Sequence, residues 1–539
     1  MPFSAFAMPW AVLSVLAVAL PFLFAVTAPP SPNFWPLVFA WCCGAVLAAG
    51  ALAWGAMVRT RAQGSRLYRS AAGVLALGLL LASVVGGVVG LLQYMGVQPL
   101  ESPWIHPSVP GQAVGNLRQR NQQATLMAMG VWALLWLWVC TAQAAPRWQR
   151  AGRGWDRWLG VSLAMCLPLL AVASAATVSR TGAVQWLVMV VLVCLWRNTP
   201  ARRALPVAML GVGVYVLAAW ALPQLLLPLT GVQGEGLFAR LAGEGRQCAS
   251  RQVMWSNMLH LISLKPWTGW GWGDMGYAHY MTLFPGERFC MLLDNAHNLP
   301  LHLAVELGLP VALLLCGCAL AGVIWARPWR ETDPMRQLAW GLLALVGVHS
   351  ALEYPLWYGP FQVVSVFALL LLVVPRTGGS VRFWLLRLGT LACVAGVALL
   401  AMATYEYRVV SQLYKPVSER PIGLRNVRAV PAPSGTLFPN QIRFAWLTTH
   451  ELTAANAQEM HAVALALLHF SPEPRVVEKL IASAQALGRD DEVALHVRRY
   501  RIAYPADHAR WLASGAGREA VSAGYDITEE REPGASAAP

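Results

Sequence analysis

The sequence predicts an all-α polytopic membrane protein with about eleven transmembrane helices. The chain has 539 residues, of which 57% are hydrophobic and only 12% are charged. A soluble protein of this length carries roughly twice that charged fraction. Many separate apolar runs approach the ~20 residues that cross a bilayer as a helix. The net charge of +14 comes from basic residues scattered in short loops between these runs. That pattern orients membrane proteins and argues against nucleic-acid binding.

Eleven apolar runs supply the predicted helices. No Lys or Arg precedes the first run, so it lacks the charged start of a secretory signal and is interpreted as a retained helix. The runs near Gln185 and Leu345 are the shortest. In order, the runs are about Trp10–Val26, Phe34–Met57, Ala71–Val97, Gln122–Thr141, Trp158–Ala176, Ala183–Trp196, Leu205–Leu227, Leu299–Ala326, Gln337–His349, Leu356–Val374 and Phe383–Thr404.

Arginines in alternate short loops set the predicted orientation. Clusters that begin at Arg59, Arg147, Arg197, Arg327 and Arg376 are separated by pairs of apolar runs. Short loops rich in Lys and Arg stay in the cytoplasm, so the N-terminus is predicted to lie inside. An odd number of spans then leaves the C-terminal region outside. In a bacterium this predicts an inner-membrane protein with a periplasmic C-terminal region.

Three arginines lie in short loops on the predicted outer side, where topology does not explain them. Arg118 and Arg120 belong to GNLRQRNQQA, just before the fourth run, and Arg180 belongs to the tight loop TVSRTG. An arginine at the membrane interface is either a snorkelling anchor or a phosphate ligand. The coincidence of three, with Gln119 and Asn121 beside them, makes the two interpretations about equally strong.

The large outer loop spans about residues 228–298. Within it, Arg251–Ile262 carries apolar residues at spacings of three and four, which predicts an amphipathic helix lying along the membrane surface. The Gly- and Trp-rich stretch Pro266–Tyr277 follows. It is interpreted either as a platform on which sugars stack or, by default, as an interfacial aromatic belt.

Cys248 and Cys290 are the cysteines that lie clearly outside the apolar runs. An oxidising periplasm would allow them to pair, so a disulfide between them is predicted, with two free thiols as the alternative.

Asp294–Pro310, DNAHNLPLHLAVELGLP, joins the polar loop to the eighth apolar run. His297 and Asn298 come just before the apolar periodicity begins, and Pro300 suits a first helical turn because its missing N–H costs nothing there. An imidazole and an amide are therefore expected at a helix entrance, where water meets lipid. This is a suitable place for chemistry on a lipid-carried, water-exposed group.

A metal site is an alternative interpretation of the same stretch. Asp294, His297, His302 and Glu306 are close in sequence, but no HExxH pattern is present. No metal and no cofactor are predicted.

A second outer turn lies in HSALEYPLWYGPF, residues 349–361. Glu353 and Tyr354 precede Pro355, which predicts extended backbone and a broken helix. A carboxylate near lipid is costly unless it is paired or functional. Glu353 is therefore expected either to pair with an arginine or to form a wall of a site that faces His297.

The composition becomes that of a soluble domain from about Tyr405. Three amphipathic helices are predicted at Glu451–Phe470, Pro472–Gly488 and Asp490–Tyr504. Ala and Leu at their contact positions suggest an αα-hairpin of the tetratricopeptide type. The predicted division is thus a transmembrane domain, residues 1–404, and a periplasmic helical domain, residues 405–539, whose end from about Glu529 is expected to be disordered.

The outward-facing polar groups suggest a membrane-anchored diphosphate as the ligand. Arginine forms bidentate bonds with phosphate oxygens and stays charged at any working pH. Fixed cations stabilise the negative charge that develops on a leaving diphosphate. An attacking hydroxyl needs a general base, and histidine suits that role near neutral pH. The residues in question are Gln119, Asn121, Arg180, Arg251, His297, Glu353 and Tyr354.

Several of these blocks occur in the order found in the PglL-type bacterial protein O-oligosaccharyltransferases, which the sequence resembles. That family belongs to the larger superfamily of O-antigen ligases and Wzy-type polymerases. The blocks are GNLRQRNQQATL, TVSRTG, RQVMWSNMLHLISLKPWTGWGWG, DNAHNLPLHLAVELGLP, HSALEYPLWYGPF and YEYRVVSQLY. The resemblance implies en bloc transfer of a glycan from undecaprenyl diphosphate to Ser or Thr of a periplasmic protein, often a pilin.

The resemblance also implies roles for individual residues. His297 is similar to the essential loop histidine of the family. Gln119 and Asn121 match a polar pair, and Tyr354 matches the aromatic residue of the EYPLWY block. Arg180 and Arg251 look like the diphosphate-binding arginines. One departure concerns Arg120, which stands where the family usually has proline in a Gln-Pro-Asn sequence, and it puts the geometry of that loop in doubt.

Three rival functions remain open at this stage. An O-antigen ligase would use the same chemistry with lipid A–core as the acceptor, and a glycan polymerase would extend a polysaccharide. A transporter of lipid-linked glycans would use the arginines as a substrate path. The transporter is disfavoured because its charges should lie in the middle of helices and because no inverted repeat is evident.

Overall fold

The protein is described by a computed structural model in which all regular elements of the described residues are helical. These are residues 7–57, 60–97, 102–149, 155–234, 236–237, 247–373 and 379–514. The predicted cytoplasmic arginines Arg59 and Arg376, and the predicted disordered end from Glu529, lie outside these ranges. The chain divides into two units. The first comprises Met1–Gly245, His297–Leu299 and Cys316–Thr404, and the second Arg246–Ala296, Pro300–Leu315 and Tyr405–Pro539.

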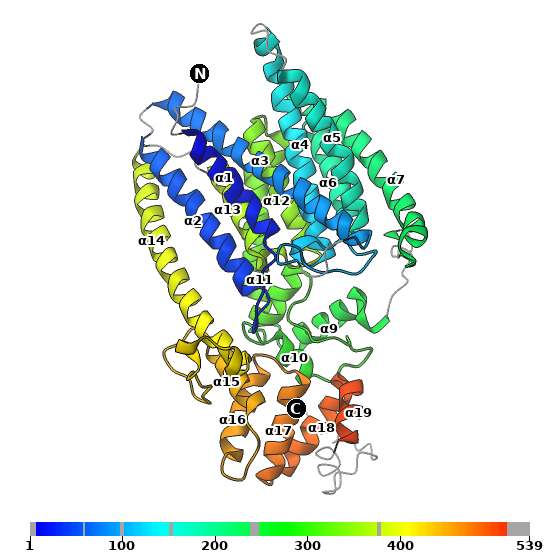
Figure 1. Cartoon of the computed structure of the whole chain (residues 1–539), viewed down its shortest axis with the longest axis vertical. Coiled ribbons are helices and arrows are strands. Elements are labelled where there is room, and N and C mark those ends of the chain that lie inside the picture. Colours follow the sequence, from blue (N-terminus) through cyan, green and yellow to red (C-terminus); the bar gives the residue numbers. More distant parts are fainter. Residues whose placement is uncertain are drawn as a thin grey trace, which may run out of the picture. The chain divides into compact units, whose positions relative to one another are not determined.

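Each of the eleven apolar runs overlaps a helix (Figure 1). Two of them have the predicted bounds, namely α2 and α11. The longer helices of the chain are α1 (Ala7–Leu23), α2 (Phe34–Met57), α3 (Arg61–Tyr94), α4 (Arg120–Gln149), α5 (Trp155–Ala176), α6 (Arg180–Leu195), α7 (Leu205–Thr230), α9 (Arg251–Leu264), α10 (Met275–Met281), α11 (Leu299–Ala326), α12 (Pro334–Ser350), α13 (Gly359–Val373), α14 (Gly379–Val410), α15 (Pro439–Thr449), α16 (Ala457–Leu468), α17 (Pro474–Ala486), α18 (Asp490–Ala503) and α19 (Pro505–Ala513). Short 3₁₀ turns include η1 (Gly115–Leu117), η2 (Pro200–Ala204) and η5 (Pro355–Trp357).

Six of the described helices are long and apolar enough to cross a membrane, judged by length and composition alone. They are α2, α3, α4, α7, α11 and α14. The apolar helices α1, α6 and α13 and the C-terminal part of α5 are shorter. The chain is therefore a multi-pass membrane protein, and the count of eleven spans stays a prediction.

The start of α3 differs from the prediction by ten residues. The helix begins at Arg61 rather than Ala71, so it carries the polar residues that were expected in a loop. Thr60 supplies the reason, because its hydroxyl accepts the backbone N–H of Gln63 while the Gln63 side chain accepts the backbone N–H of Thr60. This reciprocal capping box fixes the helix start ahead of the apolar run.

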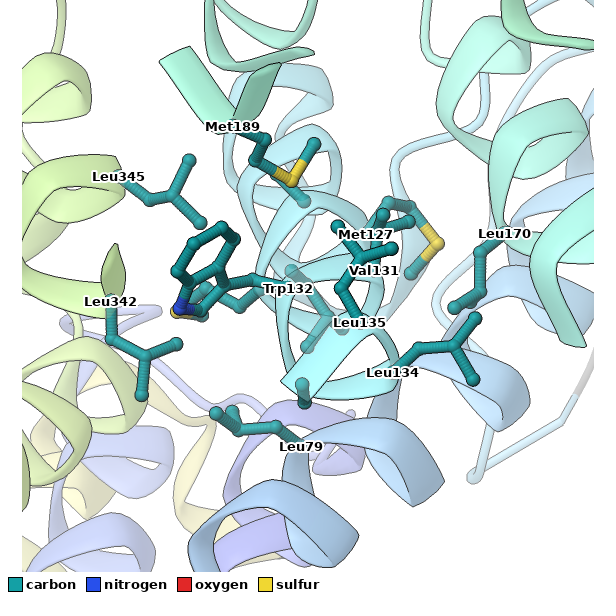
Figure 2. Packing of buried hydrophobic residues seen from close by; sticks show 14 of the residues in the cluster. Leu79, Met127, Val131, Trp132, Leu134, Leu135, Leu170, Met189, Leu342 and Leu345 are labelled. Carbon is teal, nitrogen blue, oxygen red and sulfur yellow. The ribbon is translucent and has the colours of Figure 1, made fainter. Parts of the chain in front are cut away.

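Helix α4 is the most deeply buried of the six long apolar helices and contacts α3, α5, α6 and α12. Figure 2 shows Trp132 of α4 among leucines and methionines from these neighbours. A side chain at Gly341 of α12 would come within 2.0 Å of the Trp132 ring, so glycine lets the two helices approach closely. The Trp132 indole N–H also donates to the carbonyl of Leu338 at 3.1 Å. These contacts fix α12 against α4.

Helix α9 of the second unit has the predicted periodicity, but its apolar face does not lie on a membrane surface. Met254, Met258 and Leu261 are buried against Met275 and Val305 of the same unit. The prediction that this face is turned to the membrane is wrong for the buried residues, because periodicity identifies the apolar face without identifying what covers it. The position of the helix along the membrane surface stays a prediction. The predicted disulfide is present: Cys248 and Cys290 are bonded, with a Cα–Cα distance of 5.5 Å.

Helix α11 is interrupted at Gly308, whose φ of 80° lies in the left-handed region. The Trp-rich loop supplies partners for the backbone groups that the break releases. The N–H of Trp270 donates to the carbonyl of Val305 at 2.9 Å, and the N–H of Leu309 donates to that of Pro266 at 2.8 Å. Such non-helical backbone within an apolar segment is tolerated where protein satisfies it. Trp267 and Trp272 of this loop are exposed, which agrees with both interpretations of the stretch.

The C-terminal part of the second unit consists of α15 to α19, which share an apolar core. Two of these helices, α15 and α19, were not predicted, and the resemblance to a tetratricopeptide hairpin stays a prediction. The helix expected from Glu451 begins at Ala457 instead. Residues 451–456 form a turn in which the Asn456 side chain accepts the N–H of Thr453 and donates to the carbonyl of Glu451.

Candidate active site

The carboxylate of Glu353 is the centre of a polar cluster in the first unit. Glu353 follows α12 and is only 3% exposed. One of its oxygens, Oε2, lies 2.6 Å from Nδ1 of His297 and accepts from Nε2 of Gln119 at 3.1 Å. The other, Oε1, accepts from Nδ2 of Asn121 at 2.7 Å. A buried carboxylate is tolerated when donors of this kind surround it.

Ser179 connects this cluster to a third helix. Its hydroxyl donates to Oδ1 of Asn121 at 2.6 Å and accepts the backbone N–H of Gly182 at 3.1 Å, which caps the N-terminus of α6. One chain of hydrogen bonds therefore runs from the start of α6 through Asn121 to Glu353 and on to His297. It fixes the relative positions of α4, α6 and the segment after α12.

Three residues at the cluster have a backbone conformation that is unfavourable for side chains other than glycine. The φ angles are 63° at Arg118, 51° at Val178 and 47° at His297. Arg118 precedes Gln119, and Val178 precedes Ser179. Positive φ is a genuine outlier for a β-branched residue such as Val178. Strain of this kind costs of the order of 1–3 kcal/mol per residue and concentrates at functional sites.

The bond between His297 and Glu353 sets the chemistry of the imidazole. A carboxylate only accepts hydrogen bonds, so Nδ1 carries the proton in this pair, and Nε2 is the ring nitrogen that can accept a proton. The His297 side chain is 29% exposed, whereas that of Glu353 is 3% exposed. The ring of Tyr354 packs edge-on against the imidazole, with 5.0 Å between ring centroids. His297 is thus oriented from one side and remains reachable by solvent.

Two interpretations were given for Glu353, a pairing with an arginine and a wall of a site that faces His297, and the first of them stays a prediction. Glu353 faces His297, as the other interpretation predicted. Asn298 takes part in the same region, since its side-chain N–H donates to the carbonyl of Ala351 at 3.0 Å. The fold brings five of the predicted site residues together in this cluster: Gln119, Asn121, His297, Glu353 and Tyr354.

A deeper layer of polar residues was missed by sequence reasoning. Thr125 of α4, Gln185 of α6 and His349 of α12 are fully buried. The Thr125 hydroxyl lies 2.8 Å from Nδ1 of His349 and 2.8 Å from Nε2 of Gln185. The available signal was spacing: Thr125 lies four residues after Asn121, and His349 four residues before Glu353. The layer joins the three helices that supply the site, one turn further into the bundle.

The arginines divide into different groups. Arg118 donates to the carbonyl of Pro32 and to the side chain of Asn33, so it anchors a neighbouring loop. Arg180 is the first residue of α6, is exposed, and forms no ion pair with any residue that the structure describes. Arg251 begins α9 in the second unit, behind the N-cap Ser250. The assignment of Arg180 and Arg251 as diphosphate ligands stays a prediction.

Within the described part of the chain, no three His, Cys, Asp or Glu side chains are grouped as a metal ion would require. His302 and Glu306, two of the possible metal ligands, are buried in the second unit, with Nε2 and Oε2 3.4 Å apart. Trp272 packs edge-on against His302.

Three family models match parts of the chain. The model described as "Protein glycosylation ligase" matches residues 113–138, "O-Antigen ligase" matches 164–316, and "Virulence factor membrane-bound polymerase, C-terminal" matches 337–517. A stretch of 170 residues is 29% identical to the "General O-oligosaccharyltransferase" of Acinetobacter baylyi and covers 32% of this chain. The match spans 29% of that relative, less than a third of its length. No solved structure matches the chain.

Proposed function

We propose that the protein transfers an oligosaccharide from undecaprenyl diphosphate to Ser or Thr hydroxyls of periplasmic proteins such as pilin. The partial matches to the protein glycosylation ligase and O-antigen ligase models, and to a general O-oligosaccharyltransferase, support this proposal. The reaction takes place at the periplasmic face of the bacterial inner membrane. The observation that carries this proposal is the His297–Glu353 pair, with 2.6 Å between Nδ1 and Oε2.

The pair is suited to act as a general base on the acceptor. The hydroxyl oxygen attacks the anomeric carbon of the glycan, and Nε2 of His297 takes the hydroxyl proton. The bond between that carbon and the diphosphate oxygen breaks, so undecaprenyl diphosphate leaves with its electrons. Glu353 holds the ring in the required tautomer and stabilises the imidazolium that forms. General acid–base catalysis of this kind contributes roughly 10²- to 10⁴-fold.

The leaving diphosphate needs cations, because charge builds up on it as the glycosidic bond breaks. Arg180 supplies one at the N-terminus of α6, where the helix dipole also favours an anion. Arg251 is proposed to supply a second. No metal ion is required for this scheme, since two guanidinium groups offer bidentate bonds to the phosphate oxygens.

A second candidate is an O-antigen ligase, which transfers the glycan to lipid A–core. The match of the O-antigen ligase model to residues 164–316 favours it, because that range contains Arg180, Arg251 and His297. The polymerase description that matches residues 337–517 supports a third acceptor, a growing polysaccharide, less directly. The three candidates share the donor and the base, and they differ in the acceptor.

Cells that make a lipid-linked glycan distinguish these candidates. Wild type and His297→Ala are expressed in bacteria with a candidate pilin and complete lipopolysaccharide, and glycan is sought on both by mass spectrometry. Glycan on pilin in the wild type, and its loss in His297→Ala, is the expected result. Glycan on lipopolysaccharide alone would make O-antigen ligation the function. Full transfer by His297→Ala would remove the catalytic role of this residue.

A further inference from the structure

An apolar groove lies between α6 and α7 in the first unit. Its volume is about 380 Å³, which falls within the ~300–1,000 Å³ range of small-ligand sites. No charged residue lines it. Its wall residues include Ala183, Leu187 and Val190 from α6, Met209 and Val216 from α7, and Leu237 beyond the end of α7.

The groove has a well-packed floor and open walls. The rings of Trp186 and Tyr215 form the floor, with centroids 5.4 Å apart, and both residues are buried. The walls are exposed, since Leu187 is 63% exposed and Val216 is 49% exposed. Exposed leucine and valine on apolar helices face lipid hydrocarbon, so the groove opens toward the bilayer.

One end of the groove lies about one helical turn from Arg180 along α6. Arg180, Ala183, Leu187 and Val190 are spaced by three, four and three residues, so they share one face of α6. Arg180 begins that helix, directly after Ser179, which is bonded to Asn121 of the cluster around Glu353. An anion bound by Arg180 would therefore lie at the end of α6 where the apolar face of Ala183, Leu187 and Val190 begins.

We propose that this groove holds the first isoprene units of the donor's polyprenyl chain, an inference that rests on the function proposed above. The distance from Arg180 to Val190 is ~15 Å along the helix axis, which gives a hydrocarbon chain a continuous apolar path away from the diphosphate. A wall without charged groups favours hydrocarbon and leaves a sugar hydroxyl without partners. The groove thus separates the lipid of the donor from its glycan.

Tryptophan substitutions in the walls test this assignment. Leu187→Trp and Val216→Trp fill the groove. The matched controls are Val191→Trp on α6 and Leu217→Trp on α7, both of which are exposed apolar positions outside the groove. Undecaprenyl diphosphate without a glycan is titrated into each purified full-length protein in detergent, and the dissociation constant is measured. Glycan transfer by the wild type from the complete donor is measured separately.

Filling the groove is expected to weaken binding of undecaprenyl diphosphate roughly tenfold, which corresponds to losing the burial of about two methylene groups. The two controls should bind like the wild type. If the groove variants also bind like the wild type, ordinary bilayer lipid fills the groove and the inference is wrong. Weakened binding by the groove variants, together with no transfer by the wild type, would end the proposed function but preserve the groove as a polyprenyl site.

Discussion

Replacing Glu353 by glutamine removes one negative charge from the cluster and changes little else in size. The carboxylate accepts hydrogen bonds from His297, Gln119 and Asn121. The amide of glutamine has one accepting oxygen and one donating nitrogen. At least one of the three donors then faces another donor, and the imidazole loses its anionic partner. We expect kcat for glycan transfer to fall, because the imidazolium that forms during the reaction is no longer stabilised.

The size of the effect follows from the bond that is lost. A hydrogen bond to a charged group contributes ~1.5–3 kcal/mol, and each 1.36 kcal/mol of transition-state stabilisation corresponds to about tenfold in rate. Loss of the His297–Glu353 bond in the transition state therefore lowers kcat roughly 10- to 150-fold. A loss of tautomer control adds to this value, within the ~10⁴-fold limit of acid–base catalysis.

The assay is the initial rate of transfer from a lipid-diphosphate glycan to an acceptor protein, measured on protein that elutes as a single folded species. Glu331→Gln serves as the matched control. Glu331 is also a largely buried carboxylate, bonded to Arg336 at 2.5 Å, but it lies at the start of α12 rather than at its end. Its variant should keep kcat within about twofold of the wild type. A folded Glu353→Gln protein with wild-type kcat would refute the assignment of Glu353 as the partner of the base.

The deeper polar layer predicts that Thr125→Val and His349→Leu each lose roughly 1–3 kcal/mol of stability and lower kcat. His349→Gln should recover part of kcat, and equal kcat in wild type and all three variants would exclude a positioning role. Cys248→Ser with Cys290→Ser opens a bridge across 42 residues. The second unit should then lose roughly 4 kcal/mol in loop entropy, seen as faster amide exchange in α9, and unchanged exchange would contradict this. Burial lowers the pKa of His496 from 6.5 to about 4, so the unfolded state binds the proton more tightly. The stability of the second unit should therefore fall by roughly 3 kcal/mol as the pH drops from about 6.5 to about 4. Amide exchange in α18 measures this. His496→Gln should remove this contribution and leave the contributions of His279 and His508, whose pKa values burial also lowers; an unchanged pH dependence in His496→Gln would contradict the assignment.

Much of the site can be predicted from the sequence because prolines mark where its helices begin and end. Pro355 predicts the end of a helix beside Glu353, and Pro300 predicts the start of one beside His297. A carboxylate at a helix end near lipid needs hydrogen-bond donors. The sequence offered two kinds of partner for Glu353, an arginine or His297. Sequence could not choose between them, because an arginine and a histidine are equally plausible partners until the helices are packed. That choice depends on how α12 packs against α4, where Trp132 closely approaches Gly341, and no local pattern reveals this packing.

The errors have a common physical origin. Apolar periodicity correctly located α9, but Met254 and Met258 are covered by protein instead of lipid. The same limitation hid the layer formed by Thr125 and Gln185, since a single polar residue in an apolar run has no visible partner in the sequence. Hydrophobic patterning therefore predicts which elements exist and which face is apolar. It does not predict which element covers that face.

The buried carboxylate itself explains why the site is assembled from three helices. An unpaired charge at this depth would cost several kcal/mol, so Glu353 requires donors that are already in place before substrate arrives. Asn121 and Gln119 provide them from α4, and Ser179 fixes Asn121 from the start of α6. The hydrogen bonds that stabilise the buried carboxylate thus also fix its position, and the carboxylate in turn holds His297 in one tautomer. Movement of α6 against α4 would disturb both at once, so the arrangement of the base and the position of Arg180 are expected to change together.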